Sequence, residues 1–171
     1  MVTFQDIATS EKVIPHFPGW SKPERESEHS YFEAPLDIGG VTEPGIILAG
    51  NCSLAHPDKH VTFEIYARKL PAKRRVPLMR VDWRRISGGH SNVRDRPAGL
   101  PSRVSDTHHH SFALNFNPNT GRMRRGNLPL AEECGETLED FEALCVYVGR
   151  AFRIKNMNIV SRPDWEYGRL L

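Results

Sequence analysis

The stretch Val61-Thr62-Phe63-Glu64-Ile65-Tyr66-Ala67-Arg68 decides the fold, because apolar and polar side chains alternate along it. Successive side chains of a β-strand point to opposite faces, so positions 61, 63 and 65 share an apolar face and positions 62, 64 and 66 share the other. This pattern is typical of a half-buried strand in an antiparallel sheet.

Three further strands are predicted around this one. Residues 45–52 form a short apolar run, typical of a buried strand, and residues 78–83 alternate so that Arg80 and Asp82 share one face. Residues 108–116 form the last strand, which ends at the turn sequence Asn117-Pro118-Asn119-Thr120-Gly121. In that strand His108 and His110 share a face with the aromatic residues that follow, which is expected to be the core face, whereas His109 points to the other face and is expected to contact solvent or a loop.

The clearest helix signal lies near the C-terminus. Thr137 followed by Asp140 resembles a capping box, and apolar residues then recur at helical spacing up to Phe152. We therefore predict an amphipathic helix over about 137–152 that packs on the sheet. Strands first and one principal C-terminal helix indicate an α+β fold with a mainly antiparallel sheet.

The 171 residues suit one domain of ordinary size. Residues 1–44 contain five prolines and are predicted to be an irregular segment that packs on the domain, which spans 45–171 as a single α+β unit. Between residues 84 and 103, glycines and prolines predict a connection longer than most in compact domains. Connections of this length are usually functional or disordered.

Composition narrows the class of protein. The three cysteines are widely spaced with no C-x-x-C pair, and no run of 18 apolar residues or leader pattern occurs. We therefore expect a cytoplasmic protein without a membrane partner. The sequence also lacks the phosphate-loop, dinucleotide, serine-hydrolase and zinc-protease motifs, which sets those enzyme classes aside.

Positive charge is concentrated in the middle of the chain. Residues 68–125 hold 14 of the 23 Lys and Arg residues and three of the 21 acidic residues, a balance of +11, so the flanks carry 9 − 18 = −9. Such a segment attracts polyanions, although acidic flanks could also neutralise it within the fold. Arginine grips phosphate and stacks on bases, so we expect a nucleic-acid partner, with RNA favoured over duplex DNA. The predicted nucleic-acid-binding residues are Lys73, Arg74, Arg75, Arg84, Arg85, Arg94, Arg96, Arg103, Arg122, Arg124 and Arg125.

Histidines supply the candidate chemistry. Four of the eight histidines lie within 21 positions, and His90, His108 and His110 could meet Arg80 and Asp82 in one pocket. Imidazoles transfer protons near neutral pH, a carboxylate can orient one of them, and an arginine stabilises a phosphoryl group. Alternatively, these are ordinary hydrogen-bonded residues at strand ends, with Arg80 and Asp82 forming a surface pair.

A metal site is the other chemical interpretation of the same atoms. The H-x-H pattern on a strand projects His108 and His110 to one side, and His90 could complete a set for a divalent transition metal. The cupin metal motif contains such a pattern, but no Glu follows His110 at the spacing that motif requires. The primary expectation is therefore a site without a cofactor.

These motifs also carry a family resemblance over about Val61 to Phe152. The order R-x-D at Arg80, a glycine-flanked His at His90, and H-x-H before an aromatic residue at His108 resembles uncharacterised small bacterial and phage proteins. It is more distantly similar to TumE-type toxins of toxin–antitoxin pairs, although this chain has a long Arg-rich insertion before His108. The resemblance implies that Arg80, Asp82, His90, His108 and His110 act together. It also implies a protein partner such as an antitoxin or a subunit of a defence complex.

The sequence therefore predicts a small cytoplasmic, toxin-like or phage-linked ribonuclease or related phosphotransfer enzyme that needs no metal. His108 and His110 are the predicted acid and base, Asp82 orients them, Arg80 binds phosphate and His90 assists. The first alternative is a non-catalytic module, either nucleic-acid-binding or an inhibitor or accessory subunit, that uses the basic 68–125 surface. The second is a metal-binding H-x-H enzyme.

Overall fold

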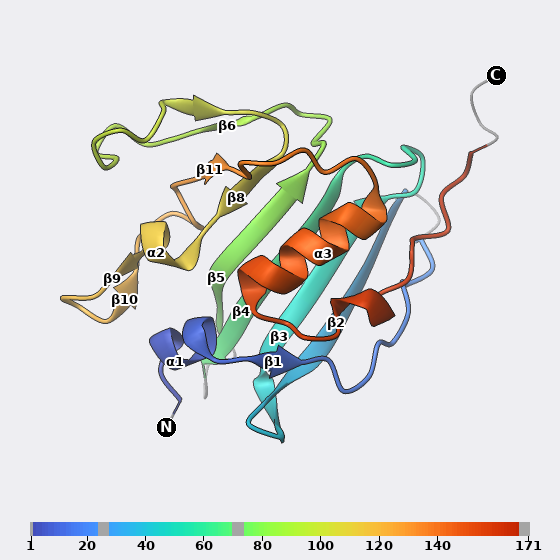
Figure 1. Ribbon diagram of the computed structural model, residues 1–171, viewed down its shortest axis with the longest axis horizontal. Coiled ribbons are helices and arrows are strands. Elements are labelled where there is room, and N and C mark those ends of the chain that lie inside the picture. The colour runs from blue at the N-terminus through green and yellow to red at the C-terminus, as the bar shows by residue number, and fades with distance from the viewer. Residues whose placement is uncertain (1, 24–27, 70–73, 168–171) are drawn as a thin grey trace.

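The computed structural model describes residues 2–23, 28–69 and 74–167. Its centre is an antiparallel sheet in the order β1-β2-β3-β4-β5-β8-β11, crossed on one face by the C-terminal helix α3 (Figure 1). The strands of this sheet are β1 (Lys12–Val13), β2 (His29–Ile38), β3 (Val41–Ser53), β4 (Val61–Lys69), β5 (Arg74–Trp83), β8 (His108–His110) and β11 (Glu132–Glu133). The predicted α+β class with a large antiparallel sheet and a C-terminal helix is confirmed.

Smaller elements surround the sheet. Two two-stranded ribbons pair β6 with β7 and β9 with β10. The elements outside the main sheet are α1 (Phe4–Thr9), β6 (His90–Ser91), β7 (Arg103–Val104), α2 (Phe112–Asn115), β9 (Phe116–Asn117), β10 (Arg122–Met123), α3 (Phe141–Phe152) and the 3-10 helix η1 (Met157–Ile159).

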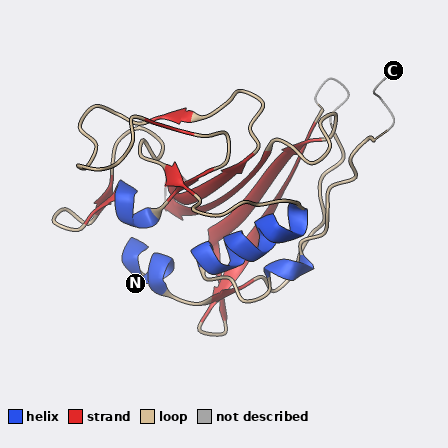
Figure 2. Ribbon diagram, turned by 45° about the horizontal axis from the view of Figure 1, so that its top comes forward, coloured by secondary structure: helices blue, strands red, loops and turns tan. Residues whose placement is uncertain are grey.

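The core lies between the sheet and α3. Phe63 and Val81 point to this side and are fully buried, and the ring of Phe63 lies 6.2 Å from that of Phe141 on the helix. Trp83 is also fully buried, and its indole Nε1 donates to the carbonyl of Leu138 just before the helix. Figure 2 shows α3 and η1 together against this side of the sheet. The opposite side of β4 and β5 carries Thr62, Glu64, Arg80 and Asp82, as the alternation predicts.

The prediction that residues 1–44 are irregular is wrong for α1 and β2. In β2 exposed and buried residues alternate from His29 to Leu36, which is a strand pattern despite Pro35. A proline has no N–H, so it cannot donate a hydrogen bond to a neighbouring strand and is usually found at the edge of a sheet. Within the described residues, however, β1 pairs with β2 only at Asp37 and Ile38, so Pro35 has no strand partner on that edge.

Several predicted element boundaries are also wrong. The predicted strand 108–116 ends at His110, where Ser111 begins the short helix α2. Helix α3 begins at Phe141 rather than near Thr137, because Asp140 is its N-cap and accepts a hydrogen bond from the Ala143 N–H. Strand β5 begins at Arg74, four residues before the predicted start.

Candidate active site

Register in the sheet brings the predicted residues together. β5 pairs with β8 so that Arg80 lies opposite His110 and Asp82 lies opposite His108. All four side chains therefore stand on the face of the sheet away from α3. Asp82 is the centre of the group, since its Oδ2 lies 3.0 Å from Nε of Arg80, 3.2 Å from Nε2 of His108 and 3.4 Å from Nε2 of His110.

His90 reaches the same place from the long connection between β5 and β8. Strand β6 pairs with β7, with His90 opposite Val104, and this ribbon carries the imidazole over the sheet. The His90 ring lies 4.7 Å from the ring of His110 and 5.8 Å from that of His108, measured between centroids. The prediction that three imidazoles, an arginine and a carboxylate meet therefore agrees with the geometry.

Each of the three imidazoles has one ring nitrogen at a main-chain carbonyl. Nδ1 of His108 lies 2.7 Å from the carbonyl oxygen of Ser105, and Nδ1 of His110 lies 2.8 Å from that of Leu128. Nε2 of His90 lies 3.0 Å from the carbonyl oxygen of Pro129. Because a carbonyl only accepts, these nitrogens carry hydrogen, and the other nitrogen of each neutral ring is a lone pair.

The lone-pair nitrogens of His108 and His110 differ in their surroundings. Nη2 of Arg80 lies 2.9 Å from Nε2 of His110, so the guanidinium donates to that nitrogen. Nε2 of His108 has no aligned hydrogen-bond partner among the described residues, although it is fully buried beside Oδ2 of Asp82. A carboxylate can only accept, so this contact is favourable only when Nε2 of His108 is protonated.

Burial and charge set the protonation of the other groups. Burial lowers the pKa of His110 to about 4, with Asp82 opposing this shift, so His110 is neutral near pH 7. Burial by itself would raise the pKa of Asp82. Interactions with the imidazole of His108, the guanidinium of Arg80 and the hydroxyl of Thr62 together hold this pKa well below its ordinary value. Asp82 is thus a carboxylate at any physiological pH.

Access to solvent differs within the cluster. His108 and His110 are 0 % exposed, and the Asp82 side chain is 2 % exposed. The Arg80 side chain is 13 % exposed, and His90 is only half-buried. In this arrangement a ligand meets His90 and Arg80 first.

His109 points to the other side of the sheet from the one that the alternation in the sequence predicted. We expected the aromatic residues after His110 to mark the core face and His109 to face outward, but the chain leaves the strand at Ser111. His109 instead faces α3 beside the Tyr147 hydroxyl, which lies 3.2 Å from its Nδ1. Burial lowers the pKa of His109 to about 4. The face shared by His108 and His110 is the polar one.

The predicted nucleic-acid-binding residues do not form one surface. Five of them line a single cleft of about 400 Å³: Arg74, Arg75, Arg122, Arg124 and Arg125. Arg84 instead ties the fold together, because its guanidinium donates to the carbonyls of Asp58 and Glu139. Arg85 lies near Asp82, and Arg94, Arg96 and Arg103 lie on the connection around β6 and β7. Lys73 lies outside the described residues.

Sequence reasoning missed supporting residues around the cluster. The Thr62 hydroxyl donates to Oδ1 of Asp82 at 2.7 Å, and Oε2 of Glu64 lies 3.9 Å from Nη1 of Arg80. Asn92 ties the connection down through hydrogen bonds with Pro101 and Ala131. The alternation in β4 placed Thr62 and Glu64 on the same face as Arg80, so this signal was present once the neighbouring strand was known.

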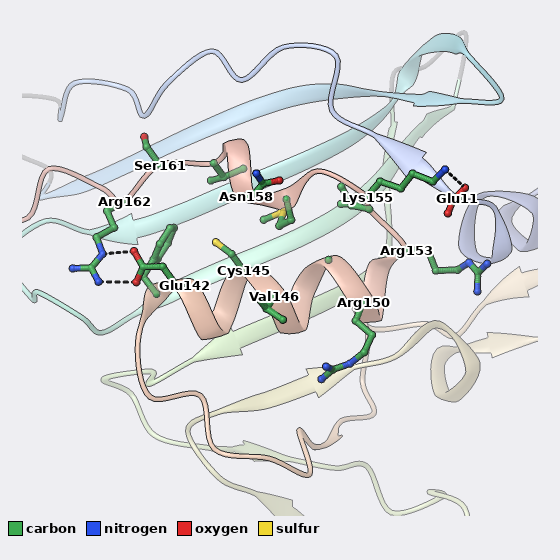
Figure 3. A pocket seen from close by; sticks show the side chains of 15 residues that line it. Glu11, Glu142, Cys145, Val146, Arg150, Arg153, Lys155, Asn158, Ser161 and Arg162 are labelled. Atoms are coloured by element: carbon green, nitrogen blue, oxygen red, sulfur yellow. Dashed lines mark hydrogen bonds and ion pairs between the residues drawn. The ribbon is translucent and has the colours of Figure 1, made fainter.

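Another cavity lies away from this cluster. It measures about 710 Å³ and runs along α3, where Glu142 pairs with Arg162 and Lys155 pairs with Glu11 (Figure 3). None of the predicted site residues lines this cavity. The positive charges of Arg150, Lys155 and Arg162 at this cavity are each paired with a glutamate. We therefore place the candidate chemistry at the histidine cluster.

Among the described residues, no helix is long and apolar enough to cross a membrane. Comparisons of the chain with protein-family models, curated proteins and solved structures find no match. The function is therefore argued from the geometry of the cluster.

Proposed function

We propose that this protein is a small, toxin-like ribonuclease that cleaves RNA by metal-independent phosphotransfer at the cluster of Arg80, Asp82, His90, His108 and His110. The observation that carries the proposal is the convergence of two imidazoles on one Arg–Asp pair, where Asp82 lies within 3.4 Å of His108, His110 and Arg80, with the ring of His90 4.7 Å from that of His110. The three free cysteines support a reducing compartment such as the cytosol as the place of action.

The reaction needs two proton transfers and one cation. The 2'-oxygen of a ribose attacks the adjacent phosphorus and the bond from phosphorus to the 5'-oxygen breaks, which leaves a 2',3'-cyclic phosphate and a 5'-hydroxyl. A neutral imidazole takes the proton of the 2'-hydroxyl, and a protonated imidazole gives one to the leaving 5'-oxygen. A guanidinium stabilises the charge that develops on the phosphoryl oxygens.

Exposure and contacts suggest the roles. His90 is the least buried imidazole of the cluster and is the candidate base, and Arg80 is the candidate phosphate ligand. His108 is the candidate acid, because both of its ring nitrogens face acceptors. Asp82 and His110 position Arg80 and His108. Since His108 is fully covered, the proposal requires the β6–β7 ribbon that carries His90 to shift when RNA binds.

The test compares the cleavage of a single-stranded RNA by the parent protein, by His90→Gln and by the control His56→Gln. His56 is exposed, and its Nδ1 contacts the Ser53 hydroxyl away from the cluster. We expect His90→Gln to lower the rate at least about 100-fold, the usual range for a lost acid or base. We expect His56→Gln and added chelator to leave the rate unchanged. Equal rates for His90→Gln and the parent, or no cleavage by the parent, would contradict the proposal.

A metal centre is the second candidate, because His90, His108 and His110 each offer one ring nitrogen and these atoms lie within 4.8 Å of one another. Carbonyl partners on the opposite ring nitrogens are the usual support of metal-binding imidazoles. The separations of 3.2 and 3.4 Å between Asp82 and two imidazoles also suit neighbouring ligands at about 2.0–2.1 Å from zinc. A bound ion would have to displace Arg80 from Nε2 of His110, however, which is why this candidate ranks second.

Calorimetric titration with Zn²⁺ separates the two candidates. The metal centre predicts one bound equivalent in the parent and loss of binding in His108→Ala, together with cleavage that chelator abolishes and Zn²⁺ restores. The metal-independent enzyme predicts no stoichiometric binding and cleavage that persists in chelator.

A further inference from the structure

A cleft of about 400 Å³ lies between the start of β5 and the segment that begins with β10, and five arginines line it. They are Arg74, Arg75, Arg122, Arg124 and Arg125. No acidic residue is among the described residues that line it. A concave wall of one sign of charge focuses the field and raises the local concentration of anions.

Two of the five arginines already have partners. Arg75 pairs with Glu64 at 2.7 Å and lies over the ring of Tyr66, and Nε of Arg124 donates to the carbonyl of Leu114. Arg74, Arg122 and Arg125 are exposed and have no hydrogen bond or ion pair from their side chains within the described part of the chain. Three uncompensated guanidinium groups therefore face one concave surface.

The wall of this cleft is also the support of the histidine cluster. Leu128 lines the cleft, and its carbonyl oxygen accepts the Nδ1–H of His110. Asn127 and Leu128 hold left-handed backbone angles, with φ of 47° and 60°, which turn this segment between the cleft and the cluster. Leu128 therefore lies between an anion bound in the cleft and His110 of the candidate active site.

We propose that this cleft binds backbone phosphates of single-stranded RNA next to the nucleotide whose bond is cleaved. The proposal rests on the proposed function, because it assigns the substrate contacts that flank the same site. Guanidinium groups grip phosphate bidentately and do not require a particular base. An acidic protein partner is the alternative polyanion, but a typical protein interface buries about 800 Å² on each side, which calls for a broader surface than this cleft.

The test measures binding of a fluorescein-labelled 2'-O-methyl oligouridylate by anisotropy over a range of salt concentrations. This probe lacks the attacking hydroxyl, so binding is measured without cleavage. The variant is Arg122→Gln/Arg125→Gln, and the control is Arg150→Gln/Lys155→Gln. The control removes the same charge from exposed ion pairs beside the α3 cavity.

We expect the cleft variant to raise Kd at least about tenfold and to reduce the slope of log K against log salt by about 1.4. Each lost contact to a single strand removes about 0.7 from that slope. The control should change Kd less than about twofold. Equal weakening by the two variants, or no binding by the parent, would overturn the proposal. So would polyglutamate that displaces the probe from the parent as effectively as unlabelled oligouridylate does, since that result favours an acidic protein.

These outcomes separate the cleft from the chemistry. Binding that depends on Arg122 and Arg125, without cleavage of unmodified RNA, supports the cleft and contradicts the proposed ribonuclease. Cleavage that depends on His90 but not on the two arginines supports the ribonuclease and contradicts the cleft.

Discussion

Asp82 lies at the centre of the candidate site and contacts several of its other groups. It is almost fully buried, which is costly for a carboxylate without partners, and it contacts Arg80, Thr62 and two imidazoles. A buried charge that loses one such partner typically destabilises a protein strongly. The network therefore fixes Arg80 and the two imidazoles in one arrangement and provides the preorganisation that phosphotransfer needs.

Gly89 sets the position of His90. A Cβ at residue 89 would lie 1.8 Å from the carbonyl oxygen of Val104, so any side chain forces the β6–β7 ribbon apart. We predict that Gly89→Ala lowers RNA cleavage at least about tenfold, because 1 Å of misplacement at a catalytic group can cost that much or more. The control is Gly45→Ala, where the added Cβ meets only an ordinary contact at 3.4 Å. Parent-level cleavage by Gly89→Ala would show that His90 needs no such placement.

Lys12 gives a pH prediction that is independent of the site. Its amine is fully buried and donates to the carbonyls of Ser10 and Phe152. Burial, with a smaller effect of Arg153, lowers its pKa from 10.5 to about 8. Between about pH 8 and 10.5 the unfolded chain holds more protons than the folded one, so stability rises with pH in that window.

The size of this effect is measurable by difference. We predict that the free energy of unfolding of the parent gains roughly 2–3 kcal/mol relative to Lys12→Met from pH 8 to pH 10.5, since one pKa unit is worth about 1.4 kcal/mol. Urea denaturation of both proteins across this range measures the gain. Parallel pH profiles of the two proteins would show that Lys12 keeps its ordinary pKa.

At the residue level, the sequence predicted which residues meet in the cluster, and the catalytic roles that it assigned to them stay predictions. The R-x-D and H-x-H spacings placed Arg80, Asp82, His108 and His110 on single faces of two strands. Whether those faces meet depends on the pairing of β5 with β8. The sequence could not show that His108 is buried, because the carbonyl of Ser105 that contacts it lies in the irregular segment between β7 and β8.

Helix α3 packs on the core face of the sheet, and Asp140 is the N-cap at which this helix begins. Asp140 accepts a hydrogen bond at 2.8 Å from the Ala143 N–H, one of the donors that a helix N-terminus leaves unpaired. We predict that Asp140→Ala lowers the free energy of unfolding by about 1 kcal/mol, as is typical for a lost N-cap. Asp140→Asn keeps the acceptor and should lose much less, and equal losses in the two variants by urea denaturation would contradict this role.

At the level of elements, period-two patterns were reliable and boundaries were not. Strand β4 follows its predicted segment closely, and β3 contains its predicted segment but begins earlier, at Val41, since alternating or continuous apolar residues mark only part of it. β2 was not predicted, because Pro35 interrupts its alternating pattern, although Pro35 fits an edge that β1 leaves open. The helix boundary was misplaced because Thr137 and Asp140 are both good N-caps, and only packing selects between them.

At the level of the whole molecule, the two faces of the sheet have different roles. One face buries the core under α3, and the other carries Thr62, Glu64, Arg80 and Asp82. The basic middle of the sequence is likewise divided in space: some arginines tie the fold together, and five line one cleft next to the histidine cluster. The charge pattern alone could not distinguish these two uses, because both need exposed or half-exposed arginines.

The most direct test of the ribonuclease proposal identifies the ends of the cleavage products. The parent protein is incubated in chelator with an RNA oligomer and with the same oligomer carrying a single 2'-deoxy nucleotide at the cleaved position. The mechanism predicts 2',3'-cyclic phosphate and 5'-hydroxyl ends from the first and no cleavage at the deoxy position of the second. Products with 3'-hydroxyl and 5'-phosphate ends, or cleavage at the deoxy position, would contradict it.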